Sequence, residues 1–163
     1  MNESSPDRHR QMAAEPAAGL KARQAVMRLC AHATGAELDQ ALSTLAPLPA
    51  HAALRPALTG LVMLQGRVGG DGAAFNLGEA STSRATVRLE NGPVGFAYHL
   101  GRNSAKASAA ALLDALWQDE ARREAVERAL RPVATRLNAE AGVSARQTAA
   151  TRVNFFTMVR GED

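Results

Sequence analysis

The residues best suited to chemistry form a glycine-rich loop with an arginine just before it. The loop reads Gly69-Gly70-Asp71-Gly72, and Arg67 stands at its start. Backbone N–H groups of such a loop can point at a phosphate while a guanidinium supplies positive charge. However, no Gly-Lys-Ser/Thr completes a P-loop, Phe75 stands where a dinucleotide fingerprint has its last glycine, and no helix opens after the loop. The sequence therefore favours a tight connection between strands over a phosphate site.

Histidine and cysteine residues lack the spacing of a metal site or of a catalytic pair. The four histidines are scattered, and Cys30 has only His32 near it. His99 falls on a predicted strand, roughly opposite Arg84, where we expect a surface hydrogen bond rather than a catalytic base. The chain also lacks Gly-x-Ser-x-Gly, His-Glu-x-x-His and an obvious pair of carboxylates. We therefore expect no metal on this chain and no catalysis by the chain alone.

The composition predicts one domain whose core consists of small side chains. The chain has 163 residues, of which 46% are hydrophobic but only 4% aromatic, and isoleucine is absent. A buried Ala contributes far less to stability than the ~1.5–3 kcal/mol of a buried Leu or Phe. We therefore expect the surface of a partner to add to the stability of the fold.

Charge and cysteine content limit the classes of function. The net charge is +3, but basic and acidic residues are interspersed, which suits an anionic ligand without demonstrating one. One Trp and one Tyr provide no stacking platform for nucleic acid. A single cysteine excludes an intrachain disulfide, and no apolar run approaches ~18–20 residues. We expect a soluble, cytoplasmic protein.

Helical spacing predicts two helices ahead of a sheet. Residues 1–15 carry little apolar surface, so we expect them to be a disordered lead-in. A helix is predicted from Ala17 to Ala33, followed by a short second helix. Thr34 and Glu37 have the spacing of a capping box at the start of the second helix, and Pro47 ends it.

An alternating pattern predicts strands on both sides of the glycine-rich loop. We expect a connector from Ala50 to Leu58, a strand from Thr59, and then a loop of about ten residues that ends at Gly78. Further along, Asn91-Gly92 favours a two-residue type I′ hairpin.

The register of this hairpin follows from its turn. If Glu90 pairs with Pro93, Val87 lies opposite Phe96 and Ala85 lies opposite Tyr98, all on one face of the sheet. The sequence therefore predicts that both aromatic side chains share a face with the small apolar residues.

The C-terminal third is predicted to be helical and then extended. An apolar stripe around Leu112 and Trp117 predicts one helix, with Asn103 or Ser104 as its N-cap. Helical spacing continues beyond it, Pro132 is expected to kink or restart this helix, and Gly142 to stop it. The predicted fold class is α+β, with an antiparallel sheet, N-terminal helices, two later helices and a C-terminal extended strand, in one domain over residues 16–163.

The last residues of the chain are apolar on both faces of an extended strand. Such a strand needs cover, either as a central strand of this sheet or as an element that docks on another chain. Both interpretations stay open. The candidate interface residues are Val153, Phe155, Phe156, Met158, Val159 and Arg160.

Several of these motifs together resemble a known family. They are Thr59–Met63, the loop with Phe75–Glu79, the segment Thr82–Leu89, Leu100-Gly101-Arg102, and Val153–Asp163. In combination they resemble the PhnG family, the G subunits of the bacterial carbon-phosphorus lyase core complex. The resemblance runs from about Ala22 to the end, and the Phe-Phe-Thr-Met-Val-Arg-Gly block near the C-terminus is its most specific part.

The resemblance implies a cytoplasmic accessory subunit of an enzyme complex. Its partners would be PhnI-, PhnH-, PhnJ- and PhnL-like subunits, with two copies each of the G, H, I and J subunits. The complex would replace the adenine of ATP by an alkylphosphonate and so form ribose 1-methylphosphonate 5-triphosphate, with Mg-ATP as its substrate. Catalytic residues are expected on the I subunit and radical cleavage on J, so this chain would need no cofactor of its own and would be inactive in isolation.

The resemblance also suggests where a polyanionic substrate could lie. The candidate residues are Arg67, Gly69, Gly70, Gly72, Arg84 and Arg102. After Arg102, relatives commonly have Asp, Lys and later His-Ala-Glu, whereas this chain has Asn103, Ser104 and Lys106-Ala107-Ser108. The resemblance therefore transfers no carboxylate or imidazole role to that helix. The alternatives are a DNA-binding regulator of a phosphonate operon and a free-standing nucleotide-binding module.

Overall fold

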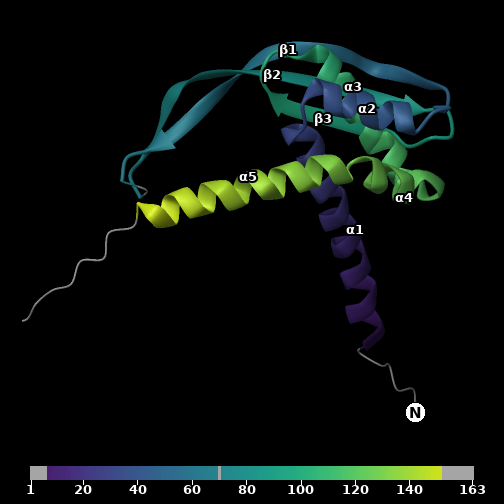
Figure 1. Cartoon of the computed structure of the whole chain (residues 1–163), viewed down its shortest axis with the longest axis horizontal. Helices are drawn as coiled ribbons and strands as arrows, with labels where there is room; N and C mark the ends of the chain where they lie inside the picture. The colour runs from purple at the N-terminus through teal and green to yellow at the C-terminus, as the bar shows by residue number, and fades with distance from the viewer. Residues whose placement is uncertain (1–6, 70, 152–163) are drawn as a thin grey trace, which may run out of the picture.

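The computed structural model describes residues 7–69 and 71–151, where five helices accompany one three-stranded antiparallel sheet (Figure 1). This confirms the α+β class, while the expected C-terminal strand lies outside the described residues. The elements are α1 (Asp7–His32), α2 (Gly35–Thr44), β1 (His51–Arg67), β2 (Ala74–Leu89), β3 (Val94–Leu100), α3 (Ser104–Gln118), α4 (Glu120–Ala129) and α5 (Arg131–Ala150).

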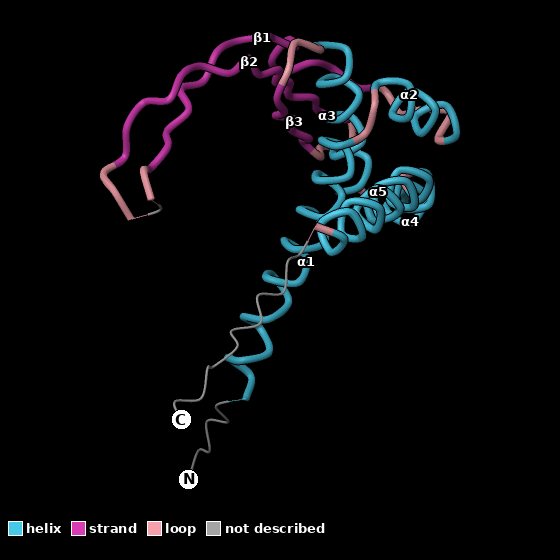
Figure 2. The backbone as a smooth tube through the Cα atoms, turned by 60° about the vertical axis from the view of Figure 1, so that its left-hand side comes forward, coloured by secondary structure: helices cyan, strands magenta, loops and turns pink. Residues whose placement is uncertain are grey.

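The sheet has the order β1-β2-β3, and α3 packs along one of its faces (Figures 1 and 2). The helices α1, α2 and α4 pack in turn against α3, and α1 also touches the edge strand β3. The strands β1 and β2 continue far beyond the end of β3 as a curved two-stranded ribbon. The core therefore lies between α3, its neighbouring helices and the short part of the sheet.

The helix starts follow local sequence rules, but α1 begins earlier than predicted. Thr34 and Glu37 form the expected capping box at α2, and of the two outcomes expected at Pro132 the structure has a restart, since α5 begins at Arg131 with Pro132 in its first turn. The helix α1 already begins at Asp7, so residues 7–15 of the predicted lead-in are helical, and residues 1–6 lie outside the described part. Arg, Gln, Met, Ala and Glu in that stretch are strong helix formers.

The later part of the chain holds three helices rather than the predicted two. Asp119 has extended backbone and its side chain accepts a hydrogen bond from the Ala121 N–H, so it ends α3 and caps α4. The prediction that Gly142 ends the last helix is wrong, since α5 runs on to Ala150. One interior glycine costs only about 1 kcal/mol, and the helix formers around it outweigh that cost.

The strands are longer than predicted. The expected connector up to Leu58 is the first part of β1, which begins at His51, and the expected loop up to Gly78 is shortened because β2 begins at Ala74. Register shifts near Arg55 explain the first error, because irregular pairing there breaks the strict alternation that the sequence analysis relied on.

The hairpin after β2 is confirmed in place, but its predicted register is wrong by one residue. Gly92 has positive φ whereas Asn91 does not, and the Gly92 N–H donates to the Leu89 carbonyl, so the loop is a turn followed by a glycine rather than type I′. Thr86 consequently pairs with Phe96, and Arg84 pairs with Tyr98. Because a one-residue slip exchanges the faces, both aromatic side chains point away from the core.

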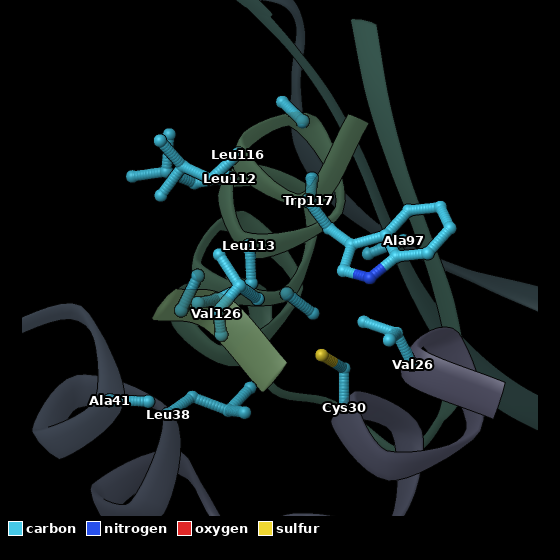
Figure 3. Close-up of a cluster of buried hydrophobic side chains, with 14 of the residues drawn as sticks. Val26, Cys30, Leu38, Ala41, Ala97, Leu112, Leu113, Leu116, Trp117 and Val126 are labelled. Carbon is cyan, nitrogen blue, oxygen red and sulfur yellow. The ribbon is translucent and has the colours of Figure 1, made fainter. Parts of the chain in front are cut away.

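The inner face of the sheet is built for close approach of α3. A Cβ atom on Gly95 would clash with the Ala111 carbonyl oxygen and the Ala115 N–H, so the helix backbone lies almost on β3. Val87, Leu89 and Ala97 complete this layer. Figure 3 shows the side chains beneath it, where Leu113 and Trp117 of α3 meet residues of α1, α2 and α4. The absence of a side chain at Gly95 therefore lets the backbone of α3 approach β3 closely.

Candidate functional site

The strands β1 and β2 continue beyond β3 as a two-stranded ribbon that no described helix covers. We call residues 61–69 and 71–81 the β-arm, because β3 ends opposite Thr82 and the described strand residues beyond that point pair only with each other (Figure 2). Two-stranded ribbons are marginally stable in water without a packed face. Packing in the core therefore does not account for the stability of the β-arm.

Both faces of the β-arm carry exposed apolar side chains. Leu61 and Met63 point to one face, and Leu64 points to the other, each with at least 40% of its surface exposed. Phe75 and Leu77 on the return strand are also exposed. An apolar surface on two sides of a ribbon is a feature of interaction sites rather than of the surface of a monomer.

The glycine-rich loop forms the tip of the β-arm and is held by its own backbone. The Gly72 N–H donates to the Val68 carbonyl over 3.1 Å, and the Arg67 Nη1 donates to the Gly72 carbonyl over 2.9 Å. Gly69 has φ +68°, and a Cβ atom on Gly72 would lie 2.6 Å from the Val68 carbonyl oxygen. These glycines are required by a tight connection. Gly70 lies outside the described residues.

The structure separates the candidate polyanion residues. Arg67 pairs with Ala74 at the tip, whereas Arg84 lies ten residues further along β2, about 34 Å away at the rise of an antiparallel strand. Arg102 lies near the base of the β-arm, where its Nε donates to the Ser81 Oγ over 3.0 Å. No single ligand of ordinary size can therefore contact both Arg67 and Arg84.

The corner that leads from β3 into α3 is pinned by Ser83. Its buried hydroxyl donates to the Gly101 carbonyl over 2.8 Å and accepts from the Asn103 N–H over 2.9 Å. Asn103 caps α3, as the sequence predicted, and the Lys106 Nζ donates to the Ala31 carbonyl at the end of α1 over 2.7 Å. Lys106 thus ties two helices together, while Ser108 is exposed.

His99 and Cys30 are buried rather than available for chemistry. The expectation that His99 makes a surface hydrogen bond is wrong: it pairs with Ser83 on the inner face, and within the described residues neither ring nitrogen has a hydrogen-bond partner. Burial lowers the pKa of His99, and Lys106 adds to this effect. Burial also raises the pKa of the Cys30 thiol to about 12, so the reactive thiolate is scarce.

An ion pair that sequence reasoning missed holds α1 against the sheet. Arg23 donates to both Asp114 carboxylate oxygens, over 2.9 Å and 2.7 Å, and the Phe96 N–H donates to the same carboxylate over 2.8 Å. Asp114 is only 1% exposed. The available signal was a carboxylate inside the apolar stripe between Leu113 and Leu116, which requires a buried partner.

The described residues provide neither a cluster of metal ligands nor a helix suited to crossing a membrane. Within residues 7–69 and 71–151, no three His, Cys, Asp or Glu side chains gather as metal ligands would. In the same part of the chain, no helix combines the length and the apolar character needed to cross a membrane.

The fold and the β-arm together define an α+β protein with a small core and a large uncovered apolar extension, the class of protein that works within an assembly. Residues 21–161 match the family described as phosphonate metabolism protein PhnG, and the chain belongs to that family. It is 52% identical over 146 residues to the alpha-D-ribose 1-methylphosphonate 5-triphosphate synthase subunit PhnG of Rhizobium meliloti (strain 1021), covering 90% of this chain and 94% of that protein. These comparisons give no support to a DNA-binding regulator.

Proposed function

We propose that this chain is the PhnG subunit of an alpha-D-ribose 1-methylphosphonate 5-triphosphate synthase. Its identity with the Rhizobium meliloti subunit supports this function, since the two proteins align over nearly their whole lengths. In this proposal the chain works in the cytoplasm with PhnI-, PhnH-, PhnJ- and PhnL-like subunits. The complex exchanges the adenine of Mg-ATP for an alkylphosphonate.

The β-arm is the observation on which this proposal depends most. Leu61, Met63 and Leu77 are each more than half exposed, and α3 covers only the short part of the sheet. Burying such side chains contributes roughly 25 cal/mol per Å² of apolar surface. A partner subunit that encloses the β-arm would therefore gain substantial binding energy.

The proposed role is to support a site on a partner rather than to catalyse. The buried His99 and Cys30 are screened from substrate, and Asp114 is occupied by Arg23. In this proposal the isolated chain has no synthase activity. The tail residues Val153 to Arg160 are proposed as a second docking element.

Co-purification with the other subunits tests the assembly. We expect the double substitution Met63→Lys and Leu77→Lys to abolish association, because each lysine would have to be buried on a different part of the β-arm. The double substitution Ala139→Lys and Gln147→Lys, at exposed positions of α5, adds the same two charges and should leave association unchanged. Phe155→Asp with Phe156→Asp tests the tail in the same assay. If the β-arm and tail variants all assemble normally, the proposal fails.

Two of the candidate arginines retain a proposed role towards the polyanionic substrate. Arg67 at the tip and Arg102 at the base of the β-arm would act at separate points, each through charge-assisted hydrogen bonds. Steady-state kinetics of the reconstituted complex with Arg67→Ala or Arg102→Ala should show a raised KM for ATP or phosphonate. Unchanged kinetics for both variants would remove this part of the proposal.

A further inference from the structure

The outer face of the sheet carries an ordered set of basic and aromatic side chains. The strand register places them in three neighbouring rows across β1, β2 and β3. These rows are Ala52-Arg88-Val94, Arg55-Thr86-Phe96 and Leu58-Arg84-Tyr98. Since α3 packs on the opposite face, this face is open, and Phe96 and Tyr98 are about half exposed.

Within the strands the charge of this face is one-sided, and Glu90, just after β2, is the nearest acid along the chain. β1 contains Arg55 and Arg67 without any carboxylate, β3 contains no acidic residue, and the single acid of β2, Glu79, lies on the β-arm. Among the described residues, Arg55, Arg84 and Arg88 make no ion pair, whereas Arg23 and Arg136 do. The arginines of the outer face therefore attract negative charge from outside the chain.

The centre of the face is hollowed. Arg55, Arg84, Phe96 and Tyr98 line a shallow depression of about 440 Å³ together with Leu54. The Arg23 guanidinium lies 6.0 Å from the centre of the Phe96 ring, at the outer limit of a cation–π contact. A depression with guanidinium groups beside aromatic rings can receive an apolar side chain while the guanidinium groups pair with negative charges around it.

The spacing of the arginines favours an extended polypeptide over a single phosphate group. Arg84 and Arg88 point to the same side of β2 four residues apart, which is about 14 Å. A compact anion is held by donors that converge within hydrogen-bond distance of it. An extended peptide has the same repeat as β2, so its alternate side chains can follow the arginines in step.

The composition of the face also favours a protein partner over nucleic acid. Leu58 and Leu100 surround the charges with aliphatic surface, and all three strands lack lysine. Arginine and aromatic residues are enriched at protein interfaces, and lysine and acidic residues are depleted there. Phosphate backbones are bound equally by lysine and gain nothing from aliphatic surface.

We propose that the outer face of the sheet, with Arg55, Arg84, Arg88, Phe96 and Tyr98, binds an extended acidic polypeptide segment that carries apolar or aromatic side chains. This inference rests on the proposed function in one respect, since it places the segment on another subunit of the same complex. It assigns Arg84 to a partner rather than to the substrate. The surface is separate from the β-arm.

Binding of a synthetic peptide to the full chain tests the inference. The probe is fluorescein-Ser-Glu-Ser-Phe-Ser-Glu-Ser, in which both Glu side chains and the Phe side chain lie on one face of an extended chain, and its binding is followed by fluorescence anisotropy at low and at raised NaCl. We expect saturable binding that weakens as salt screens the charges. The double substitution Arg84→Gln and Arg88→Gln should weaken it roughly tenfold, and Tyr98→Ser should weaken it further. Arg131→Gln with Arg146→Gln on α5 removes the same charge elsewhere and should have little effect.

Three results would overturn the inference. One is no binding of the peptide at low salt, and another is equal weakening by both pairs of substitutions. The third is tighter binding of sodium tripolyphosphate or of an oligo-dT strand, lost in the Arg84→Gln and Arg88→Gln variant, which would make the face a phosphate site. The assay uses no other subunit. The peptide can therefore fail to bind while co-purification through the β-arm succeeds, and it can bind while co-purification fails.

Discussion

Single side chains decide how the helices are held against the sheet and against each other. Asp114 joins α1, α3 and β3 through its contacts with Arg23 and the Phe96 N–H. Arg136 of α5 donates to both carboxylate oxygens of Glu37 at the start of α2, over 2.7 Å and 2.9 Å. Sequence spacing revealed the capping role of Glu37 but neither of these long-range pairs, because their partners lie far apart in the chain.

The Glu37 carboxylate makes the free energy of unfolding depend on pH. The hydrogen bonds from Arg136, and after them the Thr34 N–H, lower the pKa of Glu37 from 4.5 to about 2. Its contribution is therefore complete above pH 4.5 and is lost as the pH falls towards 2. Glu37→Gln should reduce the free energy of unfolding by about 1 kcal/mol at pH 7, a modest value because the pair is partly exposed.

Urea unfolding of both proteins at several pH values measures this effect. The difference between wild type and Glu37→Gln should shrink as the pH falls from 5 to 2.5. The substitution Gln40→Ala, at an exposed and non-titrating position of the same helix, is the control and should show no such trend. A constant difference at all pH values would contradict the assigned role of the ion pair.

At the scale of elements, the contact between α3 and β3 depends on Gly95, which has no side chain. Gly95→Ala would drive a methyl group into the backbone of α3 at Ala111 and Ala115. We expect it to reduce the free energy of unfolding by about 3 kcal/mol, because neither the strand nor the helix can move without disturbing the core.

Gly60 provides the matched control for this substitution. It also lies in a strand, but a Cβ atom there would have nothing within 4 Å, and its φ is not positive. Gly60→Ala should therefore change stability by less than about 1 kcal/mol. Thermal unfolding followed by circular dichroism compares the two variants, and equal effects would show that the close approach of α3 is unimportant.

At the scale of the whole molecule, the core is compact while the β-arm, α1 and α5 extend from it (Figures 1 and 2). Such extensions have few buried contacts and open locally at low free-energy cost. We expect trypsin to cut the isolated chain after Arg67, at the tip of the β-arm, before it cuts after Arg84 or Arg88 within the three-stranded part of the sheet.

Mass spectrometry of the early fragments measures this order. Arg67→Gln should remove the early cut, and assembly with the other subunits should protect it, since the proposed partner encloses the β-arm. An early cut at Arg84 instead would mean that the sheet opens before the β-arm. Unchanged cleavage after Arg67 in the assembled complex would mean that the β-arm stays exposed.

The sequence by itself determined the elements that depend on neighbouring residues. The capping box at Thr34, the restart at Pro132, the hairpin at Asn91-Gly92 and the Asn103 cap are all local effects, and the structure has each of them. The α+β class and the family resemblance were also evident from pattern and motif.

Only the tertiary structure decided which faces these elements present and which distant residues meet. The hairpin register depends on the φ of Asn91. Because the observed register differs from the predicted one by one residue, Phe96 and Tyr98 lie on the open face rather than in the core. Likewise, Arg67 and Arg84 appeared as one candidate site because the sequence does not show that an extended strand holds them about 34 Å apart. Spacing along a chain predicts local structure, whereas contacts depend on the path that the chain takes between them.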